Sequence, residues 1–287
     1  MGRTMSGAFG YKDLLVSIDP SIEGRQRARF AMRLAGRHGA SLIGYYAAPT
    51  VGQYLAAALS EDASRKAGRG AARPAVQAVD AADAMAEQFE DELKRRHLDG
   101  TWLLSGEDPA QDIARRARTA DLCILGLGNP DPGVPDPQGF RPDEVILSCG
   151  RPVLGLPVAN LPDEVGRQVL VAWDGSREAS RALNDALPLI LGAKSVTVLS
   201  VDPDEAMWES TQAAAGHLRR HGVAATPHKI PGAGMGIGDV ILAHCDYLDA
   251  DLVVAGAYGH SRLREAALGG VSRTLLRQMM VPVLMSH

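Results

Sequence analysis

Apolar runs of about five to seven residues recur along the chain, separated by longer stretches of mixed polarity. In the first half they are KDLLVSI, SLIGYYA, TWLLSG, DLCILG and RPVLGLP, and in the second half QVLVAW, SVTVLSV, ATPHKI, DLVVAG and VPVLMS. Such continuous runs are typical of parallel strands buried on both faces. The stretches between them in the second half predict helices over about 177–191, 204–221, 236–248 and 268–279. This alternation predicts the α/β class, with doubly wound sheets and right-handed crossovers.

The two halves of the chain repeat each other. KDLLVSIDPS from Lys12 matches RQVLVAWDGS from Arg167, which aligns Asp19 with Asp174 at an offset of 155 residues (174 minus 19). Further on, DLCILGLG matches DLVVAGAYG at an offset of only 130 (251 minus 121). The difference of 25 residues predicts an insertion near 49–74 in the first half, in a stretch rich in Ala, Gly, Arg and Ser.

The repeat predicts two tandem domains, 1–157 and 158–287, each with a five-stranded parallel sheet. The stretch VANLPDEVG over 158–166 is a short linker that contains proline. Two domains of one fold can pack as a pseudo-symmetric pair, as the subunits of a homodimer do. We therefore expect an intramolecular pseudo-dimer, and a homodimer of tandem chains stays open.

Composition narrows the classes of partner. The net charge of −4 and pI of about 6.1 argue against nucleic acid, which usually requires a strongly basic face. No apolar stretch approaches the roughly 20 residues that span a bilayer, and the start MGRTMSGAFG lacks the apolar core of a signal peptide. The three cysteines form no C-x-x-C pair, which suits buried thiols in a reducing compartment. We expect a cytoplasmic protein without a membrane partner.

Candidate binding residues stand where strands of the second half end, because open parallel sheets bind ligands beyond those ends. Asp174 follows QVLVAW and can accept hydrogen bonds from a sugar hydroxyl or a base amine. Alternatively, Asp174 caps the helix that begins near Arg177, a role that Ser176 can also fill. Val201 ends SVTVLSV, and its backbone groups could meet the edge of a flat base, although any strand end offers such groups.

The stretch GAYGHSRLREAALGG combines two pairs of glycines with basic residues. Gly256 and Gly259 follow the run DLVVA, and Gly269 and Gly270 open the next helix. Glycine lets the backbone approach a ligand closely, and a helix N-terminus attracts phosphate. Ser272 adds a hydroxyl, and positive charge comes from three residues of the loop: His260, Arg262 and Arg264. A plain strand–loop–helix connection with glycine turns is the alternative interpretation.

The spacing of Gly256, Gly259 and Gly269 resembles the G-x-x-G, nine residues, G pattern of nucleotide-binding universal stress proteins. Nearly the whole chain resembles two tandem copies of that family, which implies an adenine nucleotide alpha hydrolase-like fold. The family has Ser or Thr where this chain has Gly270, and Ser272 matches a further hydroxyl position. The resemblance implies ATP or a related adenine nucleotide, with or without Mg²⁺, in the second domain. It assigns to that site Ala172, Asp174, Val201, Gly256, Gly259, Gly269, Gly270, Val271 and Ser272.

The resemblance implies that Asp174 and Ala172 lie near the ribose and that the backbone of Val201 contacts adenine. The remaining residues would surround the phosphates. The first half departs from this pattern, with Asn129 in place of the second glycine and Phe140 in place of Gly270. The intervening prolines supply no N–H groups, and the aspartates would repel phosphate: Pro130, Pro132, Pro135, Pro137, Asp131 and Asp136. We therefore predict that only the second domain binds ATP.

Three functions follow as hypotheses. The first is a stress-response protein that binds ATP in its second domain and acts as a sensor or regulator. The second is an enzyme with slow ATP hydrolysis or nucleotidyl transfer at the same pocket, although no Walker lysine, metal cluster or Ser–His–Asp order predicts dedicated catalytic or metal-binding residues. The third is an interaction or scaffold module without a nucleotide.

Overall fold

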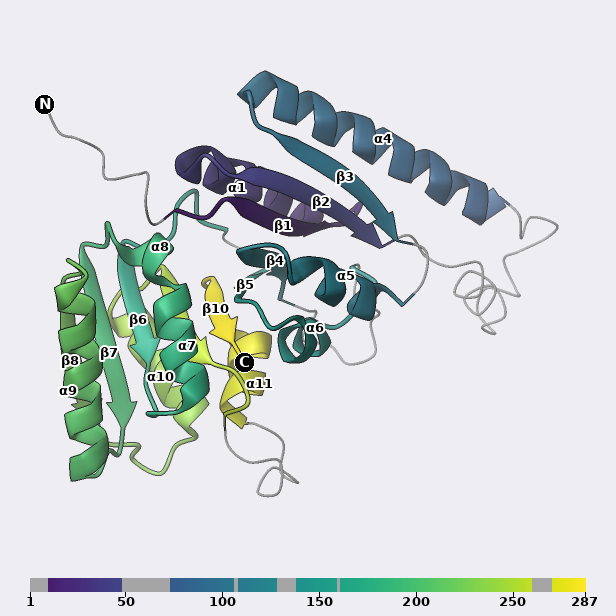
Figure 1. Cartoon of the computed structure of the whole chain (residues 1–287). Helices are drawn as coiled ribbons and strands as arrows, with labels where there is room; N and C mark the ends of the chain where they lie inside the picture. The colour runs from purple at the N-terminus through teal and green to yellow at the C-terminus, as the bar shows by residue number, and fades with distance from the viewer. Residues whose placement is uncertain (1–9, 48–72, 106–107, 128–137, 159–160, 260–269) are drawn as a thin grey trace, which may run out of the picture.

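The computed structural model describes residues 10–47, 73–105, 108–127, 138–158, 161–259 and 270–287, with backbone only over 73–81. These residues form two α/β domains built on one continuous sheet (Figure 1). The first domain contributes β1 (Asp13–Ile18), β2 (Ser41–Ala47), β3 (Gly100–Ser105), β4 (Leu122–Gly126) and β5 (Val153–Leu156). The second contributes β6 (Gln168–Ala172), β7 (Ser195–Val201), β8 (Ala225–Ile230), β9 (Leu252–Gly256) and β10 (Val283–Ser286). The predicted α/β architecture is confirmed, and the predicted boundary at 157/158 falls between β5 and β6.

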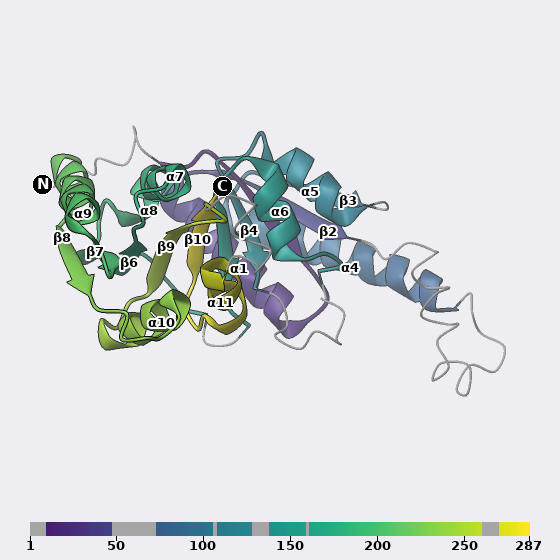
Figure 2. The same cartoon turned by 90° about the horizontal axis from the view of Figure 1, so that it is seen from below.

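Helices cover both faces of the sheet, as Figure 2 shows for the second domain, where α7 and α9 lie opposite α10 and α11. The first domain has α1 (Ile22–His38), α4 (Arg73–Arg96), α5 (Pro109–Ala117) and α6 (Pro142–Cys149). The second has α7 (Arg177–Asp185), α8 (Leu187–Ile190), α9 (Glu205–Arg220), α10 (Ile237–Tyr247) and α11 (Gly270–Gln278). None of the helices in the described part of the chain combines the length and apolar character needed to cross a membrane.

Two sequence-based expectations change in detail. The helix predicted over 177–191 is divided into α7 and α8, because Pro188 has no N–H with which to continue the helical hydrogen bonds of α7. The end of the predicted insertion at 73–74 is the first turn of α4, and residues 48–72 lie outside the described residues.

The strand order is β3-β2-β1-β4-β5-β10-β9-β6-β7-β8. Each half has the same internal order, and all pairings within a half are parallel. The halves join through β5 and β10, which pair antiparallel with Leu154 opposite Leu284. Because Leu154 and Leu284 are equivalent in the repeat, the pairing is that of a symmetric dimer. The two predicted five-stranded sheets are therefore one ten-stranded sheet.

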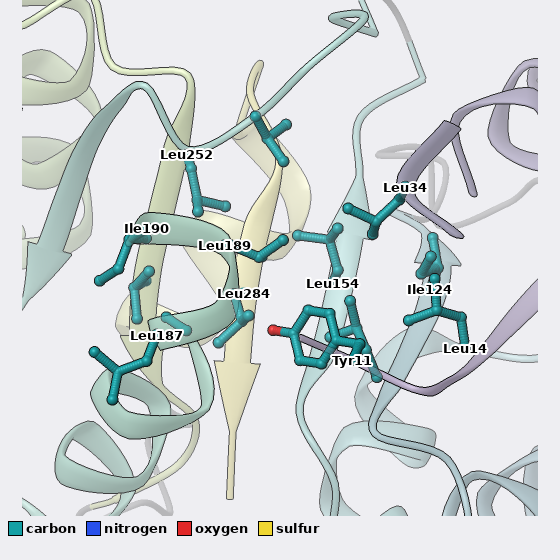
Figure 3. Packing of buried hydrophobic residues seen from close by; sticks show 14 of the residues in the cluster. Tyr11, Leu14, Leu34, Ile124, Leu154, Leu187, Leu189, Ile190, Leu252 and Leu284 are labelled. Atoms are coloured by element: carbon teal, nitrogen blue, oxygen red, sulfur yellow. The ribbon is translucent and has the colours of Figure 1, made fainter. Parts of the chain in front are cut away.

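The hydrophobic core runs across the junction of the two domains (Figure 3). One buried cluster lies against α1, α4, α7, α8 and α9, and a second lies on the other face against α5, α6, α10 and α11. Side chains of both domains meet in the first cluster, including Tyr11, Leu14, Leu154, Leu189, Leu252 and Leu284. The domains therefore share apolar burial, and they are not merely tethered by the linker.

His38 lies at the end of α1, beside this junction. Its ring packs on Tyr11 with the ring centroids 5.1 Å apart, and its Nε2 is buried without a hydrogen-bond partner in the described structure. Burial, and to a smaller extent the charges of Arg37 and Lys12, lowers the pKa of His38 from 6.5 to about 4.

This pKa predicts an acid-sensitive fold. Between pH values of about 6.5 and about 4 the unfolded chain binds a proton that folded His38 does not, so the free energy of unfolding should fall as the pH is lowered through this range. His38→Gln should flatten that profile, measured by urea denaturation at successive pH values. His97→Gln, which removes an exposed histidine, should keep the wild-type profile, and equal flattening in both variants would contradict the assignment.

Candidate functional site

A cavity of about 530 Å³ opens at the carboxyl ends of β6, β7 and β9 in the second domain. The chain leaves β6 towards β7 on one side, while β9 lies on the other side, so the cavity stands at the switch point of the sheet. Its volume is within the range of about 300–1,000 Å³ that small-molecule sites occupy.

The cavity brings together the residues that the sequence singles out. Of the nine predicted site residues, eight line it: Ala172, Asp174, Val201, Gly256, Gly259, Gly270, Val271 and Ser272. The ninth, Gly269, lies outside the described residues, as do His260, Arg262 and Arg264. Residues from three strand ends and one helix therefore share a single cavity.

The inner part of the cavity is apolar. Leu199, Ala255 and Ile241 are buried there, and Ala172 lies beside them. Val201 extends two residues beyond the last pair of β6 with β7, Ala172 opposite Leu199, and lines the cavity. This combination of apolar side chains and a strand end suits a flat ring with polar edges.

Asp174 lies at the polar rim. Its Oδ1 accepts a hydrogen bond from the Ser176 N–H at 3.0 Å, and its side chain is exposed. Ser176 is the residue that caps α7, because its Oγ accepts from the Ala179 N–H at 3.1 Å. The alternative in which Asp174 is the N-cap is therefore wrong, and Asp174 faces the cavity at the end of β6.

The glycines of the cavity wall have different roles. A Cβ on Gly256 would lie 2.5 Å from the backbone nitrogen of Ala179, so glycine is needed for α7 to pack on β9. A Cβ on Gly259 would lie 3.0 Å from both Glu178 Oε2 and Ser176 Oγ. A Cβ on Gly270 would meet no atom of the described residues within 4 Å. The first two glycines allow close packing, whereas no described residue fills the space beside Gly270.

Ser272 connects the wall to α11. Its Oγ accepts a hydrogen bond from the Tyr258 N–H at 3.2 Å, and only 5% of the residue is exposed. Gly270 and Val271 belong to the first turn of α11, where backbone N–H groups have no partner within the helix. The N-terminus of α11 therefore directs a positive partial charge at the cavity.

The charged side chains in the described lining are acidic: Asp174, Asp202 and Asp204. Asp204 caps α9, since its Oδ1 accepts a hydrogen bond from the Met207 N–H at 2.8 Å. Asp202 Oδ1 accepts from the Gly232 N–H at 2.9 Å. Sequence reasoning missed both residues, although they stand one and three positions after Val201 in the segment VDPD. All three carboxylates thus accept hydrogen bonds from main-chain N–H groups, and no lysine or arginine is present in the described lining.

In the first domain the counterpart of Asp174 lies in a buried ion pair. Asp19, the counterpart of Asp174, is 2% exposed and lies 2.5 Å from the Arg27 guanidinium, which is itself buried. Arg27 Nε also donates to the main-chain oxygen of Ser17 at 2.6 Å. At the offset of 155, the second domain has Ala182 in place of Arg27. The carboxylate that lies at the cavity rim in the second domain is therefore paired with a cation of the protein in the first.

Gln138 occupies the end of β4, the counterpart of β9. Its Oε1 accepts from the Gly126 N–H at 2.7 Å, and its Nε2 donates to the Gly126 carbonyl at 3.0 Å. Phe140, at the position of Gly270, is also buried. These contacts support the prediction of a single site. They involve Arg27 and Gln138, which sequence reasoning did not identify, although comparison of Arg27 with Ala182 would have raised the question.

Comparison with known proteins agrees with this fold. Residues 233–287 match the Universal stress protein family. A universal stress protein from Archaeoglobus fulgidus DSM 4304 is 16% identical, with 97% of each chain covered and a TM-score of 0.74. A functionally unknown protein from Pseudomonas aeruginosa PAO1 is 19% identical, with 96% of this chain and 92% of that chain covered and a TM-score of 0.62. No curated protein matches the chain. At these identities the solved structures show a shared fold.

The ion pair in the first domain predicts a strong effect on stability. Arg27→Ala leaves the Asp19 carboxylate buried without its cation, so the free energy of unfolding should fall by about 3–5 kcal/mol. Arg33→Ala is the matched control, because Arg33 pairs with the exposed carboxylate of Asp163 and should contribute less than about 1 kcal/mol. Urea denaturation measures both, and similar losses would show that burial of the pair is unimportant.

Proposed function

Residues 233–287 belong to the universal stress protein family, and the whole chain has that fold twice; from this premise we propose that the second domain binds ATP or a related adenine nucleotide. The bound state would make the protein a sensor or regulator in a stress response. The observation that carries the proposal is the single cavity shared by Asp174, Val201 and the glycines of the wall and of α11.

The residues present fit the parts of such a nucleotide. The apolar floor and the end of β7 at Val201 suit adenine, and Asp174 at the rim suits the ribose hydroxyls. The N-terminus of α11 suits the phosphates, because its backbone N–H groups and the helix dipole attract anions, and the Gly256–Gly259 wall lines the same cavity.

The proposal is one of binding without dedicated catalysis. The described residues contain no group of three or more His, Cys, Asp or Glu side chains placed to hold a metal ion. We therefore propose Mg²⁺ only as the counterion that ATP brings with it. A positive ion would also offset the carboxylates of the lining.

The proposal predicts one nucleotide per chain. Isothermal titration calorimetry should give a stoichiometry of one for ATP, and Gly259→Asp should weaken binding at least about tenfold, because it places a carboxylate beside the phosphates. Gly36→Asp adds the same charge at an exposed position of α1, where Leu98, at 3.8 Å, is the nearest described residue to a Cβ, and should leave binding unchanged.

Other outcomes separate the hypotheses. Two nucleotides per chain would contradict the prediction that only the second domain binds ATP. No binding at millimolar ATP would refute the proposal and favour an interaction module. Release of phosphate by the wild type that is lost in Gly259→Asp would favour the slow ATPase.

Gly270 predicts a gain of affinity. Because no described residue lies within 4 Å of a Cβ on Gly270, serine should fit there, and its hydroxyl can donate to a phosphate oxygen. Gly270→Ser should tighten ATP binding by about tenfold, the effect of a hydrogen bond to a charged group. Gly270→Ala adds the Cβ alone and should bind ATP as the wild type does. Equal gains in both variants would show that the hydroxyl is not the cause.

A further inference from the structure

The Gly256–Gly259 wall is held from its outer side by the last two residues of the sequence. The main-chain oxygen of Ser286 accepts from the Ala257 N–H at 2.9 Å, and Nδ1 of His287 lies 2.9 Å from the Ala257 oxygen. A carbonyl oxygen only accepts, so Nδ1 carries the proton in this contact. Both main-chain groups of Ala257 are therefore engaged on the β10 side of β9, whereas the cavity is lined by the ends of β6 and β7.

These contacts orient the peptide group between Ala257 and Tyr258. In a trans peptide the C=O and the N–H point in opposite directions. Because the Ala257 oxygen is held by His287, the Tyr258 N–H is turned towards Ser272, whose Oγ accepts it at 3.2 Å. Tyr258 and Ser272 both line the cavity. The wall thus presents an N–H, and not a carbonyl oxygen, to the first turn of α11.

The backbone at this point has a conformation that needs support. Tyr258 has φ +58°, in the left-handed region that residues with a Cβ rarely adopt. Such conformations persist where the surroundings hold them, and they cluster at ligand clamps. A flip of the preceding peptide would direct the Ala257 oxygen, with its negative partial charge, towards the place proposed for the phosphates.

Helix α7 anchors the two supporting residues. Arg181 Nη1 donates to the main-chain oxygen of His287, and Ser286 Oγ donates to Asp185 Oδ2 at 2.8 Å. Ser286 is 1% exposed. His287 therefore acts on the wall from a position held by a second element.

We propose that His287 is a positioning residue of the nucleotide site, whose ring N–H holds the Ala257–Tyr258 peptide in the orientation that keeps the Ala257 oxygen turned away from the phosphates. The inference rests on the proposed function and adds a requirement to it. It concerns the phosphate part of the ligand alone, because His287 does not line the cavity.

The test compares ATP with adenosine, which has no phosphate. His287→Ala should weaken ATP binding by about three- to tenfold, the effect of one lost hydrogen bond, and should leave adenosine binding unchanged. His287→Asn should recover most of the affinity for ATP, because its side-chain amide can donate to the same carbonyl oxygen. Isothermal titration calorimetry of the full chain measures all three proteins.

A second variant tests the orientation itself. Glycine adopts positive φ without steric cost, so Tyr258→Gly relieves the conformation that His287 supports. His287→Ala should therefore weaken ATP binding less in the Tyr258→Gly background than in the wild type. Three outcomes would overturn the inference without touching the proposed function. They are wild-type affinity of His287→Ala for ATP, equal losses of affinity for ATP and adenosine in that variant, and an undiminished effect of His287→Ala in the Tyr258→Gly background. A wild-type chain that binds no ATP would refute the proposed function, and the inference with it.

Discussion

The antiparallel pairing of β5 with β10 is the constraint on which the rest of the structure depends. It sets Leu154 opposite Leu284, its own counterpart in the repeat, and so relates the two domains as a symmetric dimer would be related. Each domain has its last strand at an edge of its own sheet, and an unpaired edge of this kind invites association with another chain. Joining these edges within one chain removes both of them and creates a common core around Leu154 and Leu284.

Duplication within one chain also allows the two sites to diverge. In a homodimer, any substitution that fills one site fills the other as well. Here Arg27 neutralises buried Asp19 in the first domain, while Ala182 leaves Asp174 exposed at the cavity in the second. The same carboxylate is therefore part of a buried ion pair in one domain and part of a cavity rim in the other. The first domain keeps the strand order and the shared core, and these do not require an open site.

Sequence patterns predict most of this fold because strand burial and helix capping are local. The apolar runs locate the ten strands, and the repeat places Asp174, Val201 and Gly256 at neighbouring strand ends. The buried polar contacts of the first domain were not predictable in this way, because Arg27 and Gln138 are distant in sequence and meet only around Gly126. The contact of His287 with Ala257 is likewise a product of strand pairing, which no local pattern encodes.

Strand β10 links the junction of the two domains to the wall of the cavity. It pairs with β5 of the first domain on one side and with β9 of the second on the other. The residues that pair with β5 end at Met285, and the next two, Ser286 and His287, support the wall of the cavity. A shift of β10 along β5 would therefore displace the hydrogen bonds to Ala257. The geometry of the domain junction and the orientation of the cavity wall are thus set by one short strand.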